Sequence, residues 1–246
     1  MRRAQHVACL AAYLERATQR RMMVTITVST PTETAVVPHG GVSRIFSCNP
    51  VATGIPTNAD PILIDTTAAM SALGPLFRAN RLGRKLPLPM IVSPDGQLSD
   101  DPSEFVDRGG GILPVGGLEQ GYKGYGMVLF TEAISGALGG FGRSGQSGDS
   151  EANGVFVQAI DPAHFAGRET FEHEMGWLAD QCRASAVAPG HDAVRVPGDR
   201  ALARKRDQLR DGVELIGPIV DDILPWAARL GCPFPPPIDP DRTVSA

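Results

Sequence analysis

The chain lacks the patterns that identify several large classes of protein. Its four cysteines include no Cys-x-x-Cys pair, so neither a zinc ribbon nor a redox dithiol is expected, and we predict buried or incidental thiols in a reducing cytoplasm. The net charge of −4 provides no concentrated basic face, and broad nucleic-acid binding is therefore not expected. No apolar run approaches the length of a membrane span, so we expect a cytoplasmic protein with no membrane partner.

Motifs for metals and for the common phosphate-binding loops are also missing. His164, His173 and His191 have no metal-ligand spacing among themselves, and no metal site is predicted. The chain contains no G-x-x-x-x-G-K-[ST] loop. A G-x-G-x-x-G string does occur over 140–145, but an expected helix precedes it and a polar loop follows. A dinucleotide fingerprint needs a strand before it and a helix after it, so we reject this match.

What the chain does have is the composition of an ordinary globular protein, with 42% hydrophobic and 20% charged residues among 246. This length can bury a core in one large domain or two modest ones. Apolar periodicity predicts helices over 2–21, 68–82, 127–138, 170–183, 200–209 and 218–230. Strands are expected over 24–29, within 36–48, and over 61–64, 155–160 and 194–196. Because these elements alternate irregularly, the pattern predicts an α/β fold with a mixed sheet rather than a regular βαβ winding.

The most informative segment is 114–126, in which five glycines surround Lys123. The expected helix 127–138 follows at once. Glycine lets the backbone approach a ligand closely, and the first turn of a helix offers free N–H groups to an anion. Since Lys123 would add a positive charge, the segment predicts a site for a phosphate-bearing cofactor.

Three other features each have a structural and a functional interpretation. Asp65 ends an expected strand, where α/β sites gather, but it is equally suited to capping a helix. Pro197-Gly198-Asp199 joins a strand to a helix, either as a simple capped turn or as a point of close approach to a ligand. His6 heads the first expected helix, where a lone histidine is usually a surface residue.

Taken together and in order, eight short motifs resemble the malate/L-lactate dehydrogenase family of NAD(P)-dependent oxidoreductases, which lack a Rossmann fold. The stretches that carry the resemblance are His6 through Tyr13-Leu14-Glu15, Val37-Pro38-His39-Gly40-Gly41, Cys48-Asn49-Pro50, Leu63-Ile64-Asp65, Leu113 to Gly117, Tyr122-Lys123-Gly124-Tyr125-Gly126, Ala159-Ile160-Asp161-Pro162 and Val196-Pro197-Gly198. Each motif is weak alone. The series covers nearly the whole chain up to about Gly217.

The resemblance implies a fold and a domain layout. The fold would be α/β with a mixed, largely antiparallel sheet, flanking helices and a non-Rossmann cofactor domain, assembled as a homodimer. Residues 1–60 would be a remnant of the substrate and dimerisation domain, and 61–198 would form the NAD(P)-binding domain. Residues 199–232 would be C-terminal helices that return to the first domain, and 233–246 a disordered tail.

The resemblance also implies an activity and a site. A hydride would pass between NAD or NADP and a 2-hydroxy or 2-keto acid, and His6 matches the proton acceptor of some members. Leu63, Ile64, Asp65, Thr66, Thr67, Ala68 and Ala69 would line the cofactor. Lys123 and Gly124 would contact its phosphates. Pro197, Gly198 and Asp199 would hold its far end, and Ser29 matches a further polar contact.

Three departures from the family pattern favour an alternative. The N-terminal segment with a Ser-His-Gly motif and a carboxylate-binding arginine is absent, which predicts an N-terminally truncated chain. Ser93 replaces an aspartate that orients the histidine, and the hydroxyl- and lysine-bearing signature becomes Thr67-Ala68-Ala69 and Gly74-Pro75. The alternative is therefore a non-catalytic, dimer-forming remnant of the dehydrogenase fold.

Overall fold

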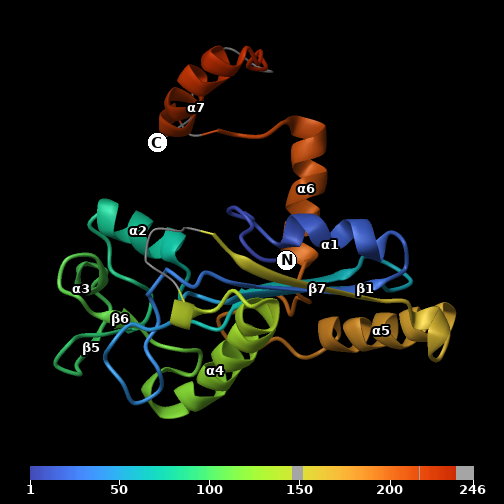
Figure 1. Cartoon of the computed structure of the whole chain (residues 1–246). Helices are drawn as coiled ribbons and strands as arrows, with labels where there is room; N and C mark the ends of the chain where they lie inside the picture. Colours follow the sequence, from blue (N-terminus) through green and yellow to red (C-terminus); the bar gives the residue numbers. More distant parts are fainter. Residues whose placement is uncertain (146–151, 216, 237–246) are drawn as a thin grey trace. The chain divides into compact units, whose positions relative to one another are not determined.

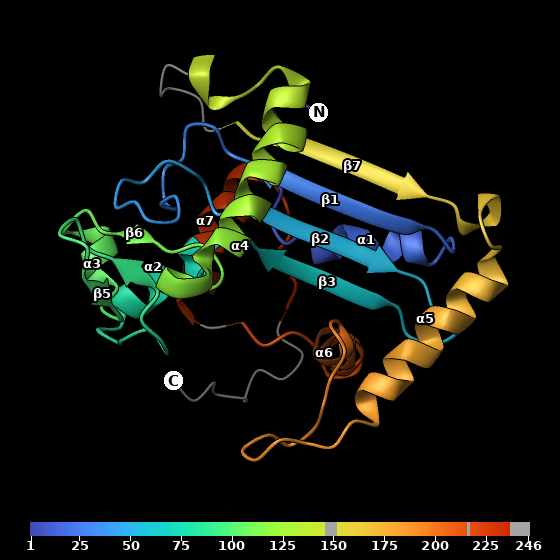
Figure 2. The same ribbon diagram turned by 90° about the horizontal axis from the view of Figure 1, so that it is seen from below.

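The computed structural model describes residues 1–145, 152–215 and 217–236. Its central element is an antiparallel sheet with the strand order β3-β2-β1-β7 (Figure 2). The strands are β1 (Met23–Ser29), β2 (Pro50–Ile55), β3 (Ile62–Thr67) and β7 (Gly154–Ile160). The register pairs Thr25 of β1 with Thr53 of β2 and with Gln158 of β7. β1 and β2 each have a neighbouring strand on both sides and form the centre of the sheet, whereas β3 forms one edge.

Helices cover both faces of this sheet (Figures 1 and 2). On one face lies α1 (Ala11–Thr18), whose Leu14 is fully buried over Gly54 of β2. On the other lie α4 (Gly117–Thr131) and a π-helical turn, Glu132–Gly136. The hydroxyls of Thr27 in β1 and Ser135 in this turn are 2.6 Å apart and hydrogen-bonded. Both faces of β1 are thereby shielded from solvent.

A second antiparallel sheet, in the order β5-β4-β6, is made of very short strands. These are β4 (Ile91–Val92), β5 (Leu98–Ser99) and β6 (Gly111–Ile112), with α2 (Leu73–Arg81) and α3 (Ser103–Val106) packed nearby. The main apolar core joins this region to α4, since Leu76, Ile91, Ile112 and Val128 are all fully buried in one cluster. The core therefore lies beside the C-terminal end of β3 rather than beneath the centre of the large sheet.

Two further helical regions complete the fold. The helix α5 (Arg168–Arg183) packs on β3 through a buried cluster of Ile62, Ala179 and Val196. The chain divides into two compact units, Met1–Gly198 and Asp199–Ala246. The second unit contains α6 (Asp199–Asp211) and α7 (Gly217–Leu230). Among the residues described, no helix combines the length and apolarity needed to cross a membrane.

The predicted α/β class with a largely antiparallel sheet is confirmed, and so are most elements, but one helix and two strands were predicted wrongly and one strand was missed. The helix expected over 2–21 is confined to α1, because Ala4 pairs with Asn153 and Ala8 has a left-handed backbone with φ 53°. The strand β2 was missed, since its Thr and Gly interrupt the apolar alternation. No strand forms over 194–196, and region 36–48 contributes only isolated bridges.

The glycine-rich segment is also organised differently from its prediction. It is not a loop before a helix, because α4 already begins at Gly117, after a turn in which Gly116 and Gly117 have φ values of 103° and 66°. Lys123 and Gly124 thus lie inside the helix. The rejected string 140–145 follows helical turns rather than a strand, as predicted.

The roles expected for the domains, substrate binding and dimerisation for one and NAD(P) binding for the other, stay predictions. The large sheet takes strands from both sides of the proposed boundary at 60–61, since β1 and β2 precede it and β3 and β7 follow it. The division between the two units falls between Gly198 and Asp199. The tail prediction for 233–246 concerns residues that, from 237 on, lie outside the described part.

Replacing Gly124 by alanine is predicted to destabilise the protein by roughly 1–3 kcal/mol, because the added Cβ would collide with the backbone of Val115. Gly126 provides the matched control: it lies in the same helix, and a Cβ added there would meet nothing within 4 Å. Gly126→Ala should be neutral or stabilising by up to about 1 kcal/mol. Urea unfolding of both variants measures the difference, and equal stabilities would refute the close packing of α4 on Val115.

Candidate functional site

The edge strand β3 is the element to which the predicted cofactor segments attach. At its start, the N–H of Leu63 donates to the carbonyl of Pro197 over 2.9 Å. Gly198 follows with φ 105°, and a Cβ there would lie 2.9 Å from the Leu63 nitrogen. The Pro197–Gly198 turn is therefore held directly against β3, and only glycine fits the second position without strain.

At the other end of β3, two hydrogen bonds lead to α4. The N–H of Val115 donates to the carbonyl of Ala68 over 2.9 Å, and the N–H of Gly124 donates to the carbonyl of Val115 over 3.1 Å. Ala69 also forms a bridge with Pro114. The structure thus brings together the predicted segments 63–69 and 123–124, with Val115 as the residue between them.

Between these two attachment points the outer edge of β3 carries backbone polar groups. In an antiparallel strand the N–H and C=O of alternate residues point to the same side. The backbone N–H of Leu63 points away from β2, so the backbone N–H and C=O groups of Asp65 and Thr67 point away from β2 as well. The attachment points are five residues apart, which corresponds to roughly 16 Å along an extended strand. This is an elongated site, suited to an extended ligand.

Several predicted lining residues have structural roles of their own. Asp65 accepts hydrogen bonds from the Ala11 N–H at 2.8 Å and from the Cys9 thiol at 3.4 Å, so its carboxylate caps α1 from another strand. Thr67 donates through its hydroxyl to the Cys48 carbonyl and accepts from the Ala69 N–H at 3.0 Å. The helix-cap alternative for Asp65 is therefore realised, although for α1 rather than for the helix that follows it.

The remaining lining residues differ in exposure. Ile64 is half-buried and Thr66 is exposed, whereas Ala68 and Ala69 belong to the main core. Lys123 is exposed, with its ammonium 5.7 Å from the Tyr122 ring centroid. Asp199 begins the second unit and is described with that unit. Solvent-side ligands can therefore reach Thr66 and Lys123 but not the two alanine side chains.

Ser29, at the end of β1, is fully buried, and its hydroxyl has no hydrogen-bond partner in the described structure. A buried hydroxyl without a partner costs about 1–3 kcal/mol unless water or a ligand satisfies it. The hydroxyl of Thr131 in α4 is also buried without a hydrogen-bond partner in the described structure. Both hydroxyls belong to elements in contact across the sheet face, where β1 meets α4.

His6 lies on an extended segment ahead of α1, not at the head of a helix. Asn153 fixes this segment by donating its side-chain amide to the Gln5 carbonyl at 3.0 Å. The imidazole is exposed, and its Nδ1 accepts from the Ala8 N–H at 3.2 Å. In the neutral ring this bond places the proton on Nε2. His6 must release the Ala8 N–H before Nε2 can accept a proton.

Sequence reasoning missed a group of half-buried charged side chains, one of which, Glu33, is influenced by the charge of His6. Arg143 donates to Glu132 at 2.7 Å and to the carbonyls of Pro31 and Glu33. Burial raises the pKa of the Glu33 carboxyl, while the charges of Arg143 and His6 act in the opposite direction. Since His6 influences Glu33, the two side chains share one electrostatic environment.

The sequence around Glu33 and Arg143 gave no indication that these side chains are shielded from solvent. Arg143 lies in the rejected glycine string, and Glu33 follows a Thr-Pro-Thr turn. Their site extends to Cys48, whose thiol pKa is raised to about 12 by burial and by the charge of Glu33. Ser93, by contrast, bonds within its own turn to Asp95 and Gln97, and no described contact links it to His6.

The fold defined by this sheet and its helices is that of non-Rossmann dehydrogenases. The malate dehydrogenase of Entamoeba histolytica superposes with a TM-score of 0.85 at 21% identity, covering 95% of this chain and 68% of that one. The sulfolactate dehydrogenase of Methanocaldococcus jannaschii gives 0.78 at 29% identity, covering 94% and 66%. The family model described as malate/L-lactate dehydrogenase matches residues 1–224.

The chain belongs to the malate/L-lactate dehydrogenase family. The malate dehydrogenase of Pyrococcus abyssi is 27% identical over 239 residues, which are 94% of this chain and 65% of that protein. The L-sulfolactate dehydrogenase of M. jannaschii is 32% identical over 219 residues, 87% of this chain and 61% of that protein. The chain thus spans less than two thirds of the length of these relatives.

Proposed function

We propose that this protein binds NAD or NADP along the outer edge of β3 and transfers a hydride between the nicotinamide and a small 2-hydroxy or 2-keto acid. The observation that carries the proposal is the pair of backbone attachments that join Pro197–Gly198 and Lys123–Gly124 to opposite ends of β3. Segments far apart in the sequence, each expected to contact the cofactor, thereby lie along a single strand. Relatives named as malate and sulfolactate dehydrogenases support the substrate class.

The residues present fit a dinucleotide in three respects. Gly198 leaves its backbone accessible at a position where any Cβ would be too close to Leu63. The outward backbone groups of Asp65 and Thr67 provide hydrogen-bonding partners, and exposed Lys123 supplies the positive charge for a phosphate. Ser29, which the family resemblance matches to a polar cofactor contact, is fully buried in β1 and is separated from this edge by β2, so its role stays a separate prediction. The nicotinamide, when bound, supplies the hydride chemistry.

His6 is the group of this chain proposed to move the proton. Its exposed imidazole can take the hydroxyl proton of a 2-hydroxy acid at Nε2 once the proton of the neutral ring has shifted to Nδ1. Two local changes are needed: the exposed 3.2 Å bond from the Ala8 N–H breaks, and the ring proton moves from Nε2 to Nδ1.

A second candidate is a non-catalytic, dimer-forming remnant of the same fold. It is favoured by the structural engagement of Asp65 as a cap and by the burial of Ala68 and Ala69 in the core, because neither role needs a cofactor. The two candidates differ in whether cofactor binds and whether a substrate is turned over. The homodimer and the cytoplasmic location implied by the family resemblance are parts of both proposals.

NADH and NADPH titrations followed by nicotinamide fluorescence test the binding half. Lys123→Ala should weaken binding about tenfold, the effect of losing a charge-assisted contact of roughly 1.4 kcal/mol. Lys85→Ala is the matched control, because Lys85 pairs with Asp100 in the region of the small sheet. No binding by the wild-type protein, or equal losses in both variants, would contradict the site at β3.

Turnover of 2-keto acids with NADH or NADPH tests the catalytic half. His6→Ala should lower kcat by about 10²–10⁴ while leaving the cofactor Kd unchanged, because general acid–base catalysis contributes that much and His6 holds no cofactor phosphate. An unaltered rate would remove His6 from the mechanism. Cofactor binding without turnover in the wild-type protein would favour the non-catalytic alternative.

A further inference from the structure

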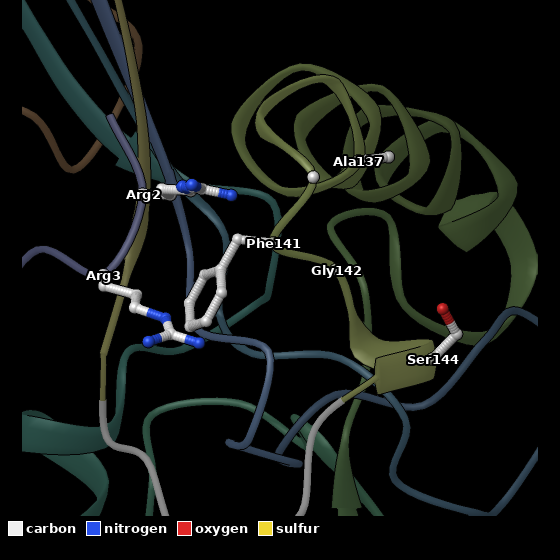
Figure 3. A pocket seen from close by; sticks show the side chains of 7 residues that line it. Arg2, Arg3, Ala137, Phe141, Gly142 and Ser144 are labelled. Carbon is white, nitrogen blue, oxygen red and sulfur yellow. The ribbon is translucent and has the colours of Figure 1, made fainter.

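A cavity of about 430 Å³ opens between the first residues of the chain and the helical turns after α4. Its lining residues are Arg2, Arg3, Ala137, Gly140, Phe141, Gly142 and Ser144. Figure 3 shows the two arginine side chains reaching in from one side, with the Arg3 guanidinium beside the Phe141 ring and Ser144 across from them. The Arg3 guanidinium carbon is 5.9 Å from the centroid of that ring. The cavity is therefore a cationic one with an aromatic wall.

The backbone directs both arginines to the same place. Met1 exchanges hydrogen bonds with Val155, and Ala4 exchanges them with Asn153. Two residues, Arg2 and Arg3, thus stand opposite the single residue Gly154, which is the arrangement of a β-bulge. Arg3 has φ 57°, a left-handed conformation that is uncommon for a side-chain-bearing residue. Bulges of this kind re-aim side chains, and here the result is a pair of guanidiniums in one cavity.

Neither arginine has a counter-charge in the part of the chain that the structure describes. Three other arginines of the first unit do have acidic partners: Arg143 pairs with Glu132, Arg168 with Asp161, and Arg21 with Glu172. Two like charges that share a cavity repel each other, so an anion entering between them gains attraction from both. Planar guanidinium groups suit a planar carboxylate, which they can hold through two parallel hydrogen bonds.

We propose that the Arg2–Arg3 cavity binds the carboxylate of the substrate acid, an inference that rests on the proposed function. His6 is only three residues from Arg3, so their Cα atoms are at most about 10 Å apart. Long arginine side chains and an imidazole can converge across that distance on one small molecule. Arg2 and Arg3 then determine specificity for acids over neutral alcohols.

The binding test needs no cofactor and no turnover. Isothermal titration with malonate at low salt should show binding to the wild-type protein, and malonamide, which is uncharged and of similar size, should not bind. The double variant Arg2→Gln/Arg3→Gln should weaken malonate binding at least tenfold. Arg3→Lys should lose less than Arg3→Gln, because it keeps the charge but not the planar fork. Circular dichroism of each variant checks that the fold is intact.

Arg81→Gln is the matched control, since Arg81 is an exposed arginine near the end of α2 and its removal changes the net charge in the same direction. It should leave malonate binding unchanged. Absence of malonate binding to the wild-type protein, or equal weakening by the Arg81 variant, would overturn the proposal. Titration with NADPH distinguishes a substrate carboxylate from a cofactor phosphate as the ligand of the cavity. If the double variant loses affinity for NADPH while its affinity for malonate is unchanged, the cavity binds a cofactor phosphate instead.

The proposal and the dehydrogenase function fail in different ways. If malonate does not bind but keto acids are reduced, the cavity assignment is wrong while the activity stands. If malonate binds through Arg2 and Arg3 but no cofactor binds, the anion site stands without the dehydrogenase. In an active enzyme the double variant should raise KM for the keto acid more than it lowers kcat, because the cavity acts mainly in holding the substrate.

Discussion

The hydrogen bonds of Val115 with Ala68 and Gly124 are the constraint on which the candidate site depends. They hold α4 so close to the end of β3 that position 124 has no room for a side chain. At the opposite end of the strand, Gly198 lies so close to Leu63 that a side chain has no room there either. Close approach of backbone to backbone, made possible by two glycines, thus defines both limits of the β3 edge. A ligand that lies along this edge meets segments from widely separated parts of the sequence.

A half-buried ion pair holds the second half of the site together. Arg143 ties Glu132 at the end of α4 to the loop that carries Glu33, and Asn49 donates to the same Glu132 carboxylate. A largely desolvated pair adds little to stability by itself, but removing one partner leaves an uncompensated charge. The network therefore fixes the position of the loop that carries Glu33. At the start of the chain, the bulge at Arg2–Arg3 directs two positive charges into one cavity.

Sequence patterns predict much of this fold because most elements have local causes. The apolar alternation of β1 and β7 and the periodicity of α5 and α6 each appear within one segment. Position 124 shows where such reasoning ends. Its glycine suggested close approach of the backbone to a phosphate, but Gly124 lies within α4, and the backbone that it approaches is that of Val115. The cap of α1 by Asp65 and the burial of Glu33 likewise depend on tertiary contacts that no local pattern reveals. The family could be predicted because the resemblance rests on the order of eight motifs along nearly the whole chain rather than on one segment.

The central claim is that a nicotinamide dinucleotide lies along the outer edge of β3. Amide hydrogen exchange of the protein with and without saturating NADH or NADPH tests it most directly, because exchange reports which backbone groups become protected. The account predicts that the cofactor slows exchange at residues 63–69, at Lys123–Gly124 and at Gly198, while β7 and α5 are unaffected. Protection confined to other segments, with the amides of Asp65 and Thr67 exchanging as fast as in the free protein, would contradict it.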